Sequence, residues 1–376
     1  MAAAIFYYGG TSNVAWLYLL SYWIVALVVV AYVYAMWNRG LQAGLRVRGS
    51  ESGEGSPLEA LPERILAVGP AVPVFEGDRM QVELRIESGR GTRGPARISG
   101  SIGAEALAAA TGVIPKQGWV EVRAIGPLRR GPVGARGWVL ESGDPLGLFR
   151  YQGPGVDSEL TLVLPRFAAL ADRSWPKEVE AGLAAPRAGS GTEMFGVREY
   201  RPGDPLRRIH WRSSARHGEL IVREFEPPGV QVVGIFCDPA PPTPEAADQI
   251  ARLAASEAWD CLRGGGRVAL WAPGAGPTRP NESRSLWAVL EWLARYPGLA
   301  APRGGASAGS GRVGEVDSSP PAVGDAIFVV AAKSEQIDEA LGGIRRRGGS
   351  VRGWVVGDAQ LDSDVPMQRA GLDWPL

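Results

Sequence analysis

Arginine and acidic side chains are concentrated in one stretch of the chain, residues 191–226. The same stretch holds both histidines of the protein, His210 and His217. The planar guanidinium group donates hydrogen bonds in a geometry that fits carboxylates and phosphates, so this clustering indicates an ion-pair network or an anion site. The seven arginines are Arg198, Arg201, Arg207, Arg208, Arg212, Arg216 and Arg223, and the six acids are Glu193, Glu199, Asp204, Glu219, Glu224 and Glu226.

Turn-forming residues predict how this stretch folds. Pro202-Gly203 suits the centre of a type II turn, because proline presets φ and glycine adopts a positive φ. Asp204 followed by Pro205 has the features of a helix N-cap and first helical residue. We therefore predict a short helix over residues 206–214, between strands at residues 196–201 and 220–225.

One long, gap-free pattern runs through the stretch. It consists of Arg198-Glu199, Arg201-Pro202-Gly203-Asp204, Arg208, Ile209, Trp211, Ser214-Ala215-Arg216 and Arg223-Glu224-Phe225-Glu226. This pattern resembles the signature of the domain of unknown function 58 family. The resemblance implies an N-terminal membrane segment, a β-rich region and a von Willebrand factor type A-like domain. Members of the family are often encoded beside MoxR-type AAA+ ATPases, and no catalytic activity is established for them.

We expect nine residues of this signature to form either a structural network or an interaction site. A network is favoured because acids lie beside the arginines. A protein-docking surface is favoured because Arg and Trp are enriched at binding hot spots, and both interpretations can hold together. Binding of phosphate or nucleic acid is disfavoured, since 40 Lys and Arg residues balance 40 Asp and Glu residues. The nine are Arg198, Glu199, Arg201, Gly203, Asp204, Arg208, Trp211, Arg216 and Glu224.

Metal and cofactor sites are not indicated. Von Willebrand-type domains often bind a divalent metal through a DxSxS motif, and here that position reads Asp238-Pro239-Ala240-Pro241-Pro242. The carboxylate remains but both hydroxyl ligands are replaced, and one aspartate cannot supply the oxygens that a hard cation needs. Asp238 is expected to cap the turn instead. His210 and His217 lack further ligands nearby in sequence, so they form a weak metal motif.

An apolar segment at residues 14–37 predicts a membrane helix, because about 20 apolar residues span a bilayer. A cleaved signal peptide is disfavoured, since no basic region precedes the segment. Arg39, Arg46 and Arg48 follow it, so the bulk of a single-pass cell-membrane protein should be cytoplasmic. The family usually has two such helices, and residues 2–10 are too short for one. The chain is therefore a single-span member or truncated at its start.

Strand and helix patterns divide the remainder into two folded regions. Strict alternation over residues 79–87, with further strands at 119–125, 137–140 and 160–164, predicts a β-sandwich-like domain. Asp144-Pro145-Leu146-Gly147-Leu148-Phe149 also resembles the family, and we interpret it as a turn with apolar residues tucked under the sheet. Strands at 230–237, 267–271, 326–331 and 351–356 alternate with helices capped by Thr243 and Ser334, which predicts an open α/β sheet.

The predicted fold is α+β multidomain, with an N-terminal transmembrane helix, a β-sandwich-like domain and a degenerate von Willebrand type A-like α/β domain. The function expected is a non-enzymatic membrane-anchored scaffold or adaptor with a cytoplasmic docking surface, and the resemblance suggests a MoxR-type ATPase as its partner. The alternative is an envelope-associated hydrolase or metal-dependent enzyme that uses Asp204, His210 or Asp238. The predicted segments are an N-terminal tail at 1–13, a transmembrane helix at 14–37, a juxtamembrane linker at 38–57, the sandwich at 58–165, the signature at 166–229, and the α/β domain at 230–376 with a flexible insertion at 301–324.

Overall fold

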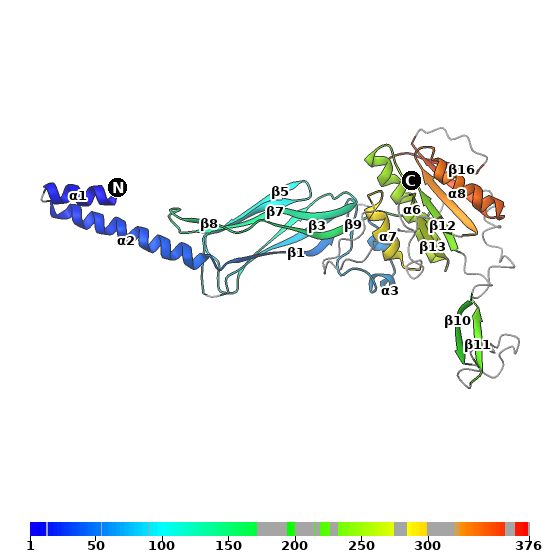
Figure 1. Cartoon of the computed structure of the whole chain (residues 1–376), viewed down its shortest axis with the longest axis horizontal. Coiled ribbons are helices and arrows are strands. Elements are labelled where there is room, and N and C mark those ends of the chain that lie inside the picture. Colours follow the sequence, from blue (N-terminus) through cyan, green and yellow to red (C-terminus); the bar gives the residue numbers. More distant parts are fainter. Residues whose placement is uncertain are drawn as a thin grey trace. The chain divides into compact units, whose positions relative to one another are not determined.

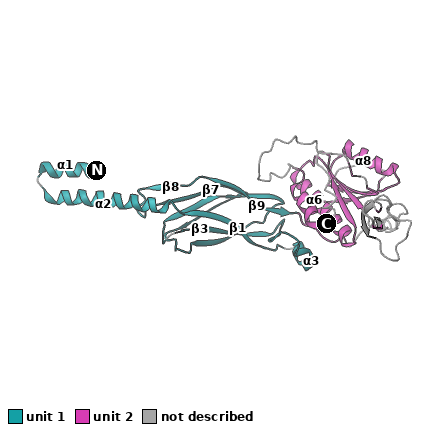
Figure 2. Ribbon diagram, turned by 60° about the horizontal axis from the view of Figure 1, so that its bottom comes forward, with its two compact units in different colours: residues 1–164 teal, residues 165–376 magenta. Residues whose placement is uncertain are grey.

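The chain folds into two compact units, residues 1–164 and residues 165–376, which are described separately here (Figure 2). The structure is a computed structural model of the chain. It describes residues 1–12, 14–53, 55–89, 91–170, 194–199, 214, 219–225, 232–273, 284–298, 320–321, 323–357 and 365–374.

The first unit begins with two packed helices, α1 (Ala2–Ser12) and α2 (Ala15–Asn38) (Figure 1). The ring of Phe6 meets the ring of Tyr18 edge-on at 5.1 Å, and the hydroxyl of Ser21 donates to the backbone oxygen of Ala2 at 3.1 Å. In the part of the chain that the structure describes, α2 is the one helix long and apolar enough to cross a membrane. Its bounds agree with the predicted apolar segment to within one residue.

Two β-sheets follow the helices. One has three strands in the order β1-β3-β6, all antiparallel. The other has the order β2-β9-β7-β4-β5, with β8 paired to β7. The bounds are β1 (Gln42–Glu51), β2 (Val74–Phe75), β3 (Arg79–Glu87), β4 (Ala96–Ile102), β5 (Glu105–Thr111), β6 (Trp119–Ile125), β7 (Gly131–Gly143), β8 (Arg150–Gln152) and β9 (Val156–Leu164).

The two sheets share one hydrophobic core, as the alternation in sequence predicts. Every second residue of β3, beginning at Met80, is buried, while its neighbours are exposed or half-buried. These side chains pack in one cluster with Ile98 of β4, Trp138 of β7 and Val163 of β9. The strands expected at residues 79–87 and 119–125 therefore have the predicted bounds, whereas β7 and β9 extend beyond the expected ones.

The region predicted as a juxtamembrane linker contains regular structure. Strand β1 pairs with β3 from Gln42 to Glu51, so half of residues 38–57 belong to the sheet. The 3-10 helix η1 (Pro57–Ala60) and the short helix α3 (Glu63–Leu66) follow before β2. In sequence, β1 alternates only weakly and contains glycine, which weakens the strand signal.

Asn38 joins the end of α2 to the sandwich. Its side chain is fully buried; its amide nitrogen donates to the backbone oxygens of Gly94 at 2.9 Å and Gly143 at 2.6 Å. Its amide oxygen accepts from the backbone N–H of Gly94 at 3.2 Å. Gly94 has a φ of 120°, and a Cβ there would lie 2.6 Å from the oxygen of Gly112, so this close approach requires glycine. The helix and the sandwich are thus connected by side-chain bonds as well as by the chain.

The loop from Asp144 to Phe149 connects β7 to β8. The carboxylate of Asp144 accepts backbone N–H groups of Leu146 at 2.8 Å and Phe149 at 2.6 Å. Leu146 and Leu148 are 58% and 51% exposed, so the prediction that they tuck under the sheet is wrong.

The second unit contains a parallel sheet in the order β13-β12-β14-β15-β16. Renumbered along the chain this is 2-1-3-4-5, one of the common orders of doubly wound sheets. Strands β10 and β11 form a separate two-stranded antiparallel sheet. The bounds are β10 (Met194–Glu199), β11 (Ile221–Phe225), β12 (Val232–Cys237), β13 (Arg267–Trp271), β14 (Asp325–Val330), β15 (Ser350–Val356) and β16 (Met367–Ala370).

Helices lie between successive strands from β12 to β15, as expected for crossover connections. The hydroxyl of Thr243 accepts from the N–H of Ala246 at 3.1 Å and so caps α6 as predicted. Ser334 occupies the N-cap of α8, as predicted, but its side chain makes no such bond. The helices are α6 (Pro244–Arg263), α7 (Leu286–Arg295) and α8 (Glu335–Arg346).

Two further features differ from the expected α/β pattern. Strand β16 follows β15, which was expected to be last, and pairs with it in parallel. Val323, at the end of the insertion predicted at 301–324, is buried in the core that α8 covers. Residues 301–319 of that insertion lie outside the described residues.

Candidate functional site

Strands β10 and β11 carry residues from the two ends of the signature pattern. Their backbones pair antiparallel, with Arg198 opposite Val222 and Glu199 opposite Ile221. Gly196 lies opposite Glu224, and the register shifts between Met194 and Gly196. The two strands predicted at residues 196–201 and 220–225 therefore exist and pair with each other, which brings the two ends of the signature pattern together.

The described part of the chain includes only some of the signature residues. Ser214, at the end of the predicted helix, is helical and 7% exposed. The structure gives backbone positions for Arg198, Glu199 and Glu224. The residues that lie outside its described part are Arg201, Gly203, Asp204, Arg208, Trp211 and Arg216, together with His210 and His217.

Asp238 lies at the carboxyl end of β12, between β13 and β14, where the strand order reverses. Ligands of doubly wound sheets bind at this position. The side chain is 2% exposed. One carboxylate oxygen accepts from the N–H of Ala240 at 2.9 Å, and the other accepts from the N–H groups of Ala331 at 3.0 Å and Ala332 at 2.9 Å.

These bonds make Asp238 a connector between two loops of the sheet edge. A carboxylate has about four lone-pair sites, so three backbone donors leave little capacity for a ligand. The hydroxyl of Tyr296, just after α7, also donates to the backbone oxygen of Asp238. In the described part of the chain, no group of three His, Cys, Asp or Glu side chains could hold a metal ion. The expectation that Asp238 caps its turn agrees with its bond to Ala240, and the structure adds the bonds to the β14 loop.

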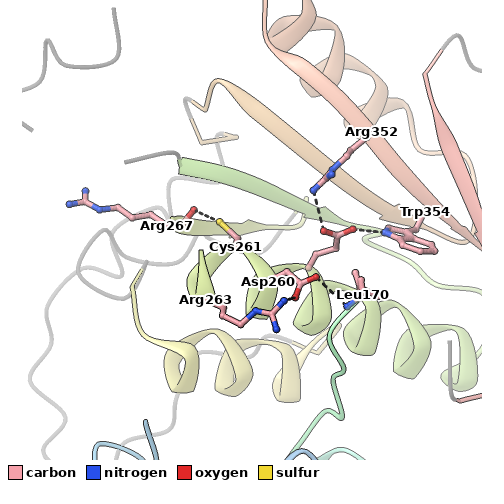
Figure 3. Close-up of polar contacts among 8 residues, drawn as sticks. Leu170, Asp260, Cys261, Arg263, Arg267, Arg352 and Trp354 are labelled. Carbon is pink, nitrogen blue, oxygen red and sulfur yellow. Dashed lines mark hydrogen bonds and ion pairs between the residues drawn. The ribbon is translucent and has the colours of Figure 1, made fainter. Parts of the chain in front are cut away.

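A buried ion pair joins α6 to β15 (Figure 3). Glu257 of α6 accepts from the guanidinium of Arg352 at 3.2 Å and from the indole N–H of Trp354 at 2.8 Å. The side chains of Glu257 and Arg352 are 0% and 7% exposed. Because an unpaired buried charge is costly, this arrangement fixes the helix against the strand.

The first residues of the second unit are attached to the same helix. The backbone N–H of Ala168 donates to the hydroxyl of Ser256 at 3.1 Å. The backbone N–H of Leu170 donates to the carboxylate of Asp260 at 3.2 Å (Figure 3). The ring of Phe167 packs against Trp259 at 5.5 Å. Ser256, Glu257 and Asp260 of α6 thus bind residues 168–170 and strand β15 of the same unit.

Sequence reasoning missed Glu257 and Asn38. Glu257 follows Ile250 by seven residues, so it falls on the apolar stripe of α6, and a charge on such a stripe signals a buried partner. That partner, Arg352, is 95 residues away and has no local signal. Asn38 ends an apolar helix, where a polar residue usually indicates only the boundary.

One part of the chain is similar to known proteins. Residues 196–300 match the family model described as protein of unknown function DUF58. The uncharacterized protein YeaD of Bacillus subtilis (strain 168) is 23% identical over 155 residues, which are 40% of this chain and 37% of that relative. The match therefore covers little more than a third of the relative's length. Most of β10, all of β11 and the first strands of the parallel sheet lie inside the matched segment, so it is this part of the chain that is similar to the DUF58 family of proteins of unknown function.

Proposed function

We propose that the protein is a non-enzymatic, membrane-anchored scaffold that presents a protein-docking surface on its signature segment. The observation that carries the proposal is that three backbone donors bind Asp238 at the position where a doubly wound sheet would bind its ligand. The buried Glu257 is likewise bonded to Arg352 and Trp354. These charges stabilise the unit internally, which favours a structural role over catalysis.

Under this proposal the second unit is a degenerate von Willebrand type A-like domain. The open parallel sheet supports the assignment, and so does a first strand that ends in aspartate. Ala240 and Pro242 occupy the positions of the hydroxyl ligands, so the domain would dock proteins without a metal.

Helix α2 anchors the body, which we place in the cytoplasm. Arg39, Arg46 and Arg48 follow the helix, and no charged side chain precedes it. Asn281-Glu282-Ser283 forms a glycosylation sequon that can report on orientation in a eukaryotic secretory system. Absence of a glycan at Asn281 is expected, and its addition would show that the body is translocated.

The partner that we propose is a MoxR-type AAA+ ATPase, as the family resemblance implies. The signature contains seven arginines and Trp211, and these residue types dominate binding hot spots. The test is binding of the full chain, inserted in lipid nanodiscs, to a purified ATPase of this class. Loss of a central arginine, as in Arg208→Ala, should weaken binding by about 2 kcal/mol or more, roughly thirtyfold in Kd.

The matched control is Arg85→Ala, an exposed arginine of β3 paired only loosely with Glu87 at 3.5 Å. It should bind like the parent chain. Stability measured on the same samples separates docking from a structural network: a network predicts that Arg208→Ala and Asp204→Ala also unfold more easily. If the signature variants bind as well as Arg85→Ala, the docking surface is not on this segment.

A further inference from the structure

Two exposed leucines stand at the tip of the loop from Asp144 to Phe149. Leu146 is 58% exposed and Leu148 is 51% exposed, although both are large and apolar. The loop projects from the end of the sandwich at which α2 enters (Figure 1). Exposed apolar side chains beside a membrane-anchoring helix indicate a surface that lipid covers.

The loop lies along α2. The ring of Phe149 meets the ring of Tyr32 edge-on at 5.6 Å. A groove of about 330 Å³ runs between the loop and the helix, and its surface is almost wholly apolar. Its lining residues are Trp23, Ala26, Leu27, Val30, Ala31 and Tyr34 of α2, with Asp144, Pro145 and Leu146 of the loop.

The length of α2 determines the depth of this groove. The helix has 24 residues, and about 20 residues cross the hydrocarbon core of a bilayer. Within α2, a stretch of that length can begin no earlier than Ala15 and end no later than Asn38. The groove-lining residues between Trp23 and Tyr34 fall inside the hydrocarbon at either limit. A loop that contacts them must therefore enter the bilayer.

The loop backbone is suited to a medium without water. Hydrocarbon cannot satisfy backbone N–H groups, so they must be bonded within the protein. The N–H groups of Leu146 and Phe149 donate to the carboxylate of Asp144, and that of Gly147 donates to its backbone oxygen. The N–H of Asp144 donates to the oxygen of Phe149, and Pro145 has none. The carboxylate itself is 2% exposed.

Polar and aromatic side chains mark the expected level of the headgroups. Arg39 and Arg150 are exposed, one at the end of α2 and one at the base of the loop. The guanidinium of Arg39 lies 4.9 Å from the centre of the Tyr151 ring. Arginine and tyrosine at the end of an apolar segment are typical of the membrane interface.

We propose that the Asp144–Phe149 loop is a second membrane-contact element: Leu146 and Leu148 enter the bilayer leaflet beside α2, and a lipid acyl chain occupies the groove between the loop and the helix. The inference rests on the proposed anchoring role of α2. With the buried bonds of Asn38, it attaches the sandwich to the membrane at two points, so that the sandwich has a fixed orientation on the bilayer.

The test measures the surroundings of a nitroxide label on the full chain in phosphatidylethanolamine–phosphatidylglycerol vesicles. Cys261→Ser removes the partly accessible thiol, and Cys237 is buried, so this chain without an added cysteine is the blank. Labels are placed at Leu148→Cys and, separately, at Leu146→Cys. Val30→Cys reports on α2, and Val68→Cys, 78% exposed beyond α3, is the aqueous control.

Relaxation by lipid-soluble oxygen is compared with relaxation by a water-soluble nickel complex. We expect the oxygen-to-nickel ratio at positions 146 and 148 to be several-fold above that at position 68 and close to that at position 30. A high ratio at position 30 with a ratio at 146 and 148 equal to that at 68 would overturn the loop proposal and leave the anchor intact. Low ratios at every site would overturn the anchor itself. Shielding of position 148 from both reagents would place it in a protein contact and also overturn the proposal.

Discussion

Asp144 in the sandwich and Asp238 in the parallel sheet both accept hydrogen bonds from backbone N–H groups, but the sequence separation between acceptor and donor differs greatly. Both carboxylates are 2% exposed, and both accept backbone N–H groups. The donors to Asp144 lie within five residues of it. Two of the donors to Asp238 lie 93 and 94 residues away. Asp144 therefore shapes one loop, whereas Asp238 joins the ends of two strands. Loss of Asp144 should destabilise only its loop, and loss of Asp238 should destabilise both strand ends.

The largest effect is expected for the buried pair that also joins distant segments. Glu257→Ala leaves Arg352 charged in the core, which should cost about 3–5 kcal/mol of stability. Hydrogen exchange followed by mass spectrometry on the full chain should show loss of protection in α6 and β15 together. The double variant Glu257→Leu with Arg352→Leu should recover part of the stability, because no charge is left unpaired. Equal loss in the single and double variants would contradict this account.

Asp238→Ala should have the next largest effect. It removes the acceptor for three buried or partly buried N–H groups, at a cost of about 3 kcal/mol. Protection should fall in β12 and β14 together, since the carboxylate bridges their ends. Asp238→Asn keeps one acceptor oxygen and should lie between Asp238→Ala and the parent chain. Loss confined to the β12 loop would show that the bridge is weak.

The cap bond of Thr243 is a local hydrogen bond in the second unit, and its loss can be compared with the loss of the long-range bonds. Thr243 caps α6 with a side-chain bond, so Thr243→Ala should cost about 1 kcal/mol. Ser334 makes no cap bond at α8, and Ser334→Ala should change stability by a few tenths of a kcal/mol at most. Protection of the two helix N-termini is the readout. A larger effect at Ser334 than at Thr243 would reverse the assignment of the caps.

Asp144→Ala should have the most local effect of these changes. Its bonds close one loop, and the core of the sandwich lies elsewhere, in residues such as Met80, Ile98 and Trp138. Exchange should rise in residues 146–149, while β3 and β4 stay protected. A fall in protection throughout both sheets would show that this carboxylate is as structural as Asp238.

The difference between the two aspartates also explains what the sequence could predict. Alternation locates β3 and β6, a Thr-Pro pair locates the start of α6, and an apolar run locates α2, because each signal is contained in a few adjacent residues. Strand β16 has only four residues, of mixed polarity, and carries no such signal.

Side-chain bonds between distant segments have no local signal either. The partners of Asp238 are loop alanines, and the partners of Asn38 are glycines 56 and 105 residues away. Burial of Leu146 and Leu148 was expected because apolar residues usually enter the core. Both side chains are exposed instead, and Leu146 lines a groove with α2. This position beside α2 depends on the tertiary fold.

Titration of the full chain with divalent cations tests most directly whether Asp238 is a connector or a ligand. Calorimetry with magnesium, calcium and manganese should show no stoichiometric binding in the parent chain, because backbone N–H groups occupy both carboxylate oxygens. The Asp238→Asn chain should behave in the same way. A one-to-one metal site in the parent chain that disappears in Asp238→Asn would contradict the scaffold account and favour a metal-dependent enzyme.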